Sequence, residues 1–182
     1  MKISIALKKD YVIKISKSLL LTFSIPVLTY LGSILRIYLP FTPVPITFQT
    51  YFVLTSAALT QWYISMSGQM LYFIAGIIGI PVFANKLTGL SAILHPTSGY
   101  ILGFIIASFI VSKMMNKRKN MVNIYLSLIL GNLIIYTSGI MRLSLLYGIK
   151  NAILIGVVPF IYGDILKIIF ASITVKILRG KI

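Results

Sequence analysis

The segment FIYGDILKIIFASITVKIL, residues 160–178, decides the fold class of this chain. It is almost entirely apolar, and its length is enough for one helix to cross the roughly 30 Å hydrocarbon core of a bilayer. Asp164 and Lys167 interrupt the run at positions i and i+3, which places them on one helix face. A charge at the centre of a span costs about 2.5–3.5 kcal/mol on insertion scales, so this pair needs a structural or functional explanation.

The composition of the whole chain agrees with a membrane protein. Of 182 residues, 58% are apolar and only 10% are charged, whereas soluble domains carry about 25% charged residues. The absence of cysteine excludes disulfides, thiolate metal sites and cysteine nucleophiles. The net charge of +15 would suit nucleic acid, but no basic stripe lies on a soluble fold. We therefore expect a single all-α integral membrane domain, residues 1–182, that contacts the lipid bilayer and no nucleic acid.

Apolar runs predict a bundle of six transmembrane helices. We expect the spans at about 16–38, 47–59, 67–83, 98–115, 121–142 and 160–178. The basic start resembles a secretory signal, but it lacks a small-residue cleavage site, so we interpret it as an uncleaved first span with a kink at Pro26.

The connections between these spans also carry predictions. LPFTPVPITFQT (39–50) contains three prolines and predicts an extended outer loop. TQWYISMSGQ (60–69) is interpreted as a tight connection, and LLYGIKNAILIGVVPF (145–160) as a short interfacial helix. No strands are expected.

The basic residues predict the orientation, because lysine and arginine accumulate on the cytoplasmic side. Twelve of the seventeen fall on one face of the six-span arrangement: Lys2, Lys8, Lys9, Lys14, Lys17, Lys113, Lys117, Arg118, Lys119, Lys176, Arg179 and Lys181. Four fall on the other: Arg36, Lys86, Arg142 and Lys150. Both termini are therefore expected in the cytoplasm, with Asp164 and Lys167 just below the outer surface.

The Asp164–Lys167 pair has two interpretations. It is either an ion pair near the interface, with the lysine reaching outward, or a polar site that faces a cavity. Pro159 and Gly163 favour the second interpretation, since they suit a broken or closely approached backbone. His95, the single histidine, has no nearby carboxylate or cysteine and predicts no metal site. No Walker A motif or lipase elbow occurs, so no ATP hydrolysis or acyl transfer is expected.

Small residues form a ridge on the expected span at 98–115. Gly99, Gly103 and Ala107 are spaced four apart and allow another helix to approach closely. Packing inside the bundle is the simpler explanation, and an interface with a partner protein is the alternative.

Four segments in order resemble one family. PFTPVPITFQT (40–50), GIIGIPVFA (76–84), HPTSGYILGF (95–104) and VVPFIYGDILK (157–167) are similar to the BioY family. That family is the biotin-specific substrate-binding (S) component of energy-coupling-factor (ECF) transporters. The resemblance implies a protein of the bacterial cytoplasmic membrane that captures biotin and needs no cofactor. It also implies partners, namely a transmembrane coupling (T) protein and two ATP-binding-cassette ATPases.

The resemblance also implies a set of ligand-binding residues. The G-D-x-x-K segment gives Asp164 and Lys167, P-x-x-G-Y gives Tyr100, and the glutamine after P-V-P-I is Gln49. The family's outer-loop asparagine would fall at Leu87 at equal loop length, and Asn85 is the nearest asparagine.

Departures from the family pattern keep other functions open. Ser98 replaces a family glycine, and Ser18, Thr22 and Pro26 stand where members carry an alanine ridge toward the coupling protein. An S component for another vitamin, a structural or assembly membrane protein without a ligand, and transport without the ATPases all remain alternatives.

Overall fold

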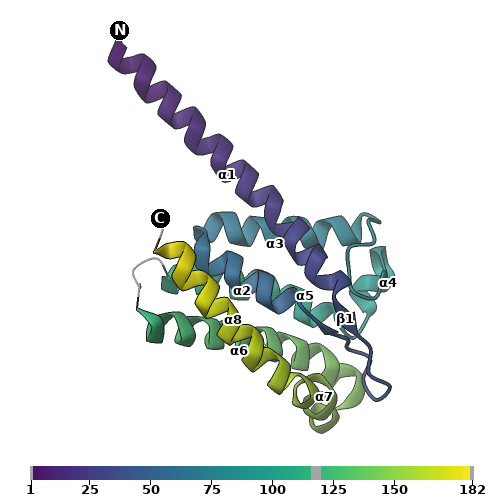
Figure 1. Ribbon diagram of the computed structural model, residues 1–182. Coiled ribbons are helices and arrows are strands. Elements are labelled where there is room, and N and C mark those ends of the chain that lie inside the picture. Colours follow the sequence, from purple (N-terminus) through teal and green to yellow (C-terminus); the bar gives the residue numbers. More distant parts are fainter. Residues whose placement is uncertain (1, 116–119, 181–182) are drawn as a thin grey trace.

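The structure, a computed structural model, describes the backbone of residues 2–115 and 120–180, and the side chains from Tyr11 onward within these ranges. The basic connection at 116–119, with three of the lysines and arginines expected on the cytoplasmic side, lies outside the described residues. The chain forms a helical bundle (Figure 1). Its elements are α1 (Lys2–Ile34), β1 (Arg36–Ile37), β2 (Ile46–Thr47), α2 (Gln49–Leu59), α3 (Trp62–Ile77), α4 (Gly89–Leu94), α5 (Ser98–Met115), α6 (Met121–Tyr147), α7 (Ile149–Gly156), the 3-10 helix η1 (Val158–Phe160) and α8 (Ile161–Arg179).

Helices α5 and α6 pack most closely, through the small residues of α5. A Cβ atom at Gly99 would overlap the Ser138 carbonyl oxygen, and one at Gly103 would lie 3.0 Å from the Ile135 Cα atom. Ala107, one turn further along, is fully buried. The ridge therefore serves packing inside the bundle, as the simpler of the two explanations predicted.

Helix α1 contrasts with this pair, because its N-terminal half extends away from the bundle (Figure 1). Only 11% of its apolar window is buried, against 61% for α5. Its C-terminal half packs on α2 and α3, where a Cβ atom at Gly32 would lie 2.8 Å from the Gln49 backbone. The helix begins at Lys2 and ends at Ile34, so the expected end of the first span at residue 38 was too late.

The expected boundary of the third span was wrong. Trp62 already lies in α3, and only two residues separate α2 from α3, because nothing in WYISMSGQM interrupts a helix. The helix ends at Ile77, before Gly79, which has a φ of 109°, and Pro81. A positive φ suits glycine and cannot continue a right-handed helix.

The proline-rich loop is bracketed by a short antiparallel ladder, so the expectation of no strands was also wrong. Arg36 pairs with Thr47 and Ile37 with Ile46. Two side chains then fasten the loop to its neighbours: the Tyr38 hydroxyl donates to the Ala84 carbonyl (2.9 Å), and the Thr42 hydroxyl donates to the Ile155 carbonyl (2.7 Å). The loop thus lies across the end of the bundle that contains α4 and α7.

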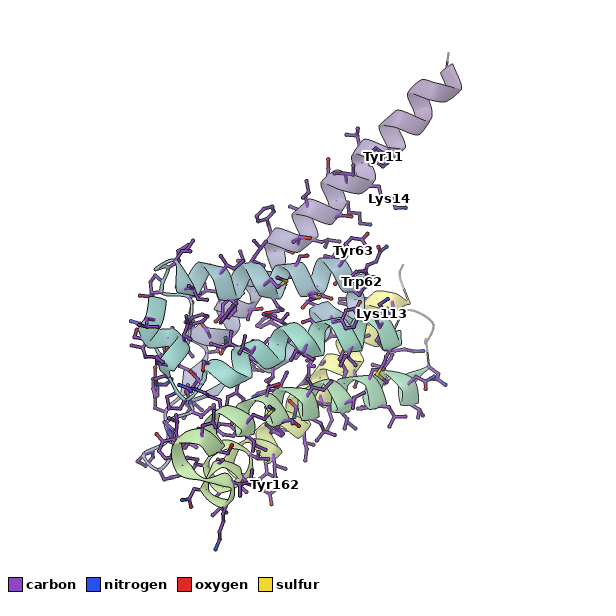
Figure 2. The ribbon with its side chains drawn as sticks, turned by 180° about the vertical axis from the view of Figure 1, so that it is seen from behind. Tyr11, Lys14, Trp62, Tyr63, Lys113 and Tyr162 are labelled. Atoms are coloured by element: carbon purple, nitrogen blue, oxygen red, sulfur yellow. The ribbon has the colours of Figure 1, made fainter. Side chains whose placement is uncertain are left out.

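Aromatic and basic side chains gather at the opposite end. Figure 2 shows Trp62 and Tyr63 at the start of α3 beside Lys113 of α5, and the Lys113 Nζ atom lies 4.9 Å from the centre of a Trp62 ring. Arg179 of α8 joins two helix ends there, donating to the carbonyls of Ala58 (2.9 Å) and Met115 (2.7 Å). Amphipathic aromatics and cations are typical of a membrane–water interface.

Four stretches of the described chain are long and apolar enough to cross a membrane. They are Tyr11–Ile34, Ser98–Met115, Met121–Tyr147 and Ile149–Arg179. With 11 and 16 residues, α2 and α3 are about 16 and 24 Å long, which is shorter than the hydrocarbon core. The chain is therefore a multi-pass membrane protein in which α2 and α3 do not meet this criterion.

Candidate functional site

A cavity lies near the end of the bundle covered by the proline-rich loop, between α2, α5, α6 and α8. Its lining is mostly apolar, with a few polar groups. It comprises Val44, Pro45, Thr47, Gln49, Thr50, Phe83, Ala84, Thr97, Tyr100, Ile101, Phe104, Ile135, Tyr136, Phe160, Asp164 and Lys167. The cavity encloses about 60 Å³, well below the roughly 300–1,000 Å³ of pockets that hold small organic ligands. A ligand of that size therefore requires the lining to move apart.

The two charges of α8 meet in this lining. The Lys167 Nζ atom lies 2.6 Å from the Asp164 Oδ1 atom, and both residues are buried, with exposed fractions of 8% and 4%. A buried charge needs a partner and hydrogen bonds, and here the nearest partner is one turn along the same helix. This geometry favours the polar site over a lysine that reaches the surface.

Two further side chains complete the surroundings of the Asp164 carboxylate. The Tyr136 hydroxyl of α6 donates to Oδ2 at 2.6 Å, and the Thr50 hydroxyl of α2 donates to Oδ1 at 3.4 Å. Neither residue was predicted from the sequence. The available signal was weak: Tyr136 is a polar residue on the buried face of an apolar helix, and Thr50 directly follows Gln49.

Gln49 lines the cavity from the first turn of α2, as expected of a ligand residue. Its Nε2 atom donates to the Tyr72 hydroxyl (2.7 Å), which donates to the Val82 carbonyl (2.9 Å). The Ser33 hydroxyl donates to the same carbonyl. This chain of bonds fixes the amide while leaving its Oε1 acceptor and second N–H for a ligand.

Tyr100 also lines the cavity, but its hydroxyl has a structural bond. It donates to the Gly156 carbonyl at the end of α7 (2.7 Å). Its ring packs directly on α6, where a Cβ atom at Gly139 would overlap it. Tyr100 therefore offers a ligand its ring, while the hydroxyl ties α5 to α7.

Asn85 lies outside the residues that line the cavity. Its Nδ2 atom lies 2.9 Å from the His95 Nδ1 atom, and its Oδ1 atom accepts from the Leu87 amide (3.1 Å). The Thr97 hydroxyl, in the lining, lies 2.9 Å from the same His95 nitrogen. Partial burial lowers the pKa of His95, which favours the neutral ring that this arrangement requires. Asn85 thus shapes the rim of the cavity through His95 and Thr97.

Gly163 departs from the expectation of a closely approached backbone. A Cβ atom there would meet nothing within 4 Å, and α8 continues unbroken through it. The irregular geometry lies before it, in η1, which contains Pro159.

Metal chemistry finds no support in this site. No group of three or more histidine, cysteine or acidic side chains that could hold a metal ion occurs within the described ranges. What the cavity offers is a carboxylate that accepts N–H groups, an ammonium that donates, and aromatic walls. This set suits a ligand with an apolar body that carries both N–H donors and carbonyl or carboxylate oxygens.

Several biotin transporters are similar to this chain in sequence, and one solved structure has a similar fold. It is 38% identical over 138 residues to the probable biotin transporter BioY of Pyrococcus horikoshii, covering 76% of this chain and 82% of that protein. It is 33% identical to the biotin transporter BioY of Thermotoga maritima, again over 138 residues and covering 75% and 82% of the two chains. Among solved structures, the S component for biotin from an ECF-type ABC transporter has the same fold, with a TM-score of 0.82, 22% identity, and coverage of 92% and 93%.

The profile of the BioY family matches residues 5–181, nearly the whole chain. The segments quoted from the sequence lie within this match. This protein is a member of the BioY family.

Proposed function

We propose that this protein binds biotin beside Asp164 and Lys167 and is the substrate-binding subunit of an ECF-type transporter. The observation that carries the proposal is the buried pair in the cavity lining of a BioY-family chain. Biotin has a ureido ring with two N–H donors and a carbonyl, an apolar bicycle and tail, and a carboxylate. A carboxylate can accept the ureido N–H groups, and an ammonium can donate to a carbonyl or carboxylate oxygen.

The other three proposed ligand residues differ in how directly they reach the ligand. They are Gln49, Tyr100 and Asn85. Gln49 supplies an amide inside the cavity, and Tyr100 supplies ring surface. Asn85 reaches the ligand only if its side chain turns from His95 when the cavity enlarges. Such enlargement accompanies binding in any case, because biotin is larger than the cavity described.

The orientation of the chain is part of the same proposal. Residues 1–182 form one S-component domain with six spans, both termini in the cytoplasm of a bacterial cell, and the proline-rich loop outside. The clustering of Trp62, Lys113 and Arg179 at the end opposite the cavity supports it. A cysteine introduced at Lys150, beside the cavity end, should react with an impermeant thiol reagent in intact cells. Protection of that cysteine would contradict the orientation.

The chain itself is proposed to be a binding subunit and no enzyme. It lacks a Walker A motif. Membership of the BioY family suggests that a T protein and two ATP-binding-cassette ATPases supply the energy. Purified alone, it should bind biotin without nucleotide, while concentrative uptake in cells should stop when the ATPase genes are deleted.

Titration of biotin into the purified protein tests the site. Asp164→Asn and Lys167→Ala should each weaken binding roughly tenfold to a hundredfold, since hydrogen bonds to charged groups contribute about 1.5–3 kcal/mol. Each single change also strands one buried charge and should lower the melting temperature.

The control is the double variant Asp164→Asn with Lys167→Met, which removes both charges. If the pair binds biotin, the double variant regains stability but not affinity. Near-wild-type affinity in the double variant would reduce the pair to a structural ion bridge. Tighter binding of a different vitamin by the wild type would identify another S component.

A further inference from the structure

The Asp164 carboxylate is held by donors from three helices. Lys167 of α8 and Thr50 of α2 donate to Oδ1, at 2.6 and 3.4 Å, and Tyr136 of α6 donates to Oδ2 at 2.6 Å. A carboxylate has about four acceptor directions. Among the described residues, only Tyr136 donates to Oδ2, which leaves one direction on that atom for an N–H group of a ligand.

Lys167 cannot by itself fix the orientation of this carboxylate. Its ammonium is a compact charge on a flexible stem with rotatable donors, and it lies on the same helix as Asp164. The terminal torsion of an aspartate is broad, so both oxygens can turn toward the ammonium. That rotation would occupy the acceptor direction that a ligand needs.

Tyr136 contacts the same carboxylate from a different helix, α6. Tyr136 is buried, with 9% of the residue exposed, and α6 packs against α5 along its length. Its hydroxyl therefore approaches Oδ2 from a fixed direction. Tyr136 belongs to α6, whereas Lys167 belongs to α8 and contacts Oδ1. The ring also lines the cavity, so the hydroxyl lies where ligand and carboxylate would meet.

We propose that Tyr136 is a positioning residue, whose hydroxyl holds Oδ2 of Asp164 so that this atom accepts an N–H group of the ligand. The inference rests on the proposed binding of biotin and deepens it. Tyr136 acts through Asp164, so its contribution depends on the carboxylate. A direct contact between Tyr136 and biotin would contribute independently.

A double-mutant cycle on purified protein separates these possibilities. Tyr136→Phe keeps the ring and removes the donor, and should weaken biotin binding about tenfold, as for loss of one hydrogen bond to a charged group. In an Asp164→Asn background the same change should alter affinity less than twofold, because residues that act together are not additive. Tyr162→Phe is the matched control, since Tyr162 is 82% exposed and points away from the bundle (Figure 2).

Each outcome decides something different. Wild-type affinity in folded Tyr136→Phe, or a full tenfold effect that persists with Asp164→Asn, would overturn the positioning role and leave biotin binding intact. Should Tyr136→Phe not fold, Tyr136→His, which keeps a ring N–H donor, should bind biotin more tightly than Tyr136→Leu, which keeps none. Equal affinities of these two variants would then overturn the inference. A wild-type protein that does not bind biotin would overturn the proposed function, and this inference with it.

Discussion

The apolar windows of helices α1 and α5 have nearly the same mean hydropathy but very different surroundings. The apolar window of α1 is 11% buried and that of α5 is 61% buried. Bilayer lipid is as apolar as leucine, so hydropathy reports that a helix can enter the membrane and says nothing about its neighbours. What separates the two is the spacing of small residues, which on α5 admits the backbone of α6.

The same difference in packing explains at which positions a larger side chain should destabilise the protein. On α5 the neighbouring helix leaves no room for a larger side chain. Along the N-terminal half of α1 the side chains are exposed, including Ser16 and Leu20. Within the described residues, the rest of the chain leaves that surface open.

The largest contrast should come from placing the same valine side chain on each helix. Gly99→Val forces a side chain into the Ser138 carbonyl and should destabilise the protein by about 3 kcal/mol, the upper end for overpacked sites. Ser16→Val on the exposed face of α1 should change stability by no more than about 0.5 kcal/mol. Thermal unfolding in detergent measures both. Equal melting temperatures for the two variants would mean that the α5–α6 contact does not determine stability.

A smaller effect should appear at the loop that leads into α5, where the pH dependence depends on His95. Burial lowers its pKa below the ordinary value of 6.5, so the folded protein binds this proton less readily than the unfolded chain. Stability from the neutral ring is therefore complete above that pH and is lost as the pH falls below it. Protonation would also place a donor against the Asn85 Nδ2 atom.

Melting temperatures measured from pH 8 to pH 5 test this expectation. The wild type should lose a few degrees more than His95→Gln over the acidic part of the range, with little difference at pH 8. Parallel profiles for the two proteins would show that His95 does not titrate in the rim.

Local sequence patterns predicted both ends of α5 correctly and both ends of α8 to within one residue. The reason is that a proline precedes each of these helices. Pro96 precedes α5, and Pro159 precedes α8. They placed the start of α3 five residues late, since no breaker marks the junction after α2. The two-residue ladder was invisible, because it depends on Arg36 meeting Thr47 across a loop.

The site was predictable where it lies within one helix and not where it joins several. Asp164 and Lys167 were visible as an i, i+3 pair in an apolar run. Tyr136 is 28 residues from Asp164, and Thr50 is 114 residues from it. Their bonds to the carboxylate arise only from the packing of α2, α6 and α8, which no local pattern reports.

The ion pair of α8 has an electrical consequence. A membrane potential does work on net charge within the field, about 2.3 kcal/mol per elementary charge per 100 mV. Asp164 and Lys167 carry opposite charges whose nearest atoms are 2.6 Å apart, so together they place almost no net charge in that field. The membrane potential therefore does almost no work on the charges of the empty site. We expect the free energy of the ligand-free site to be nearly the same at high and at low membrane potential.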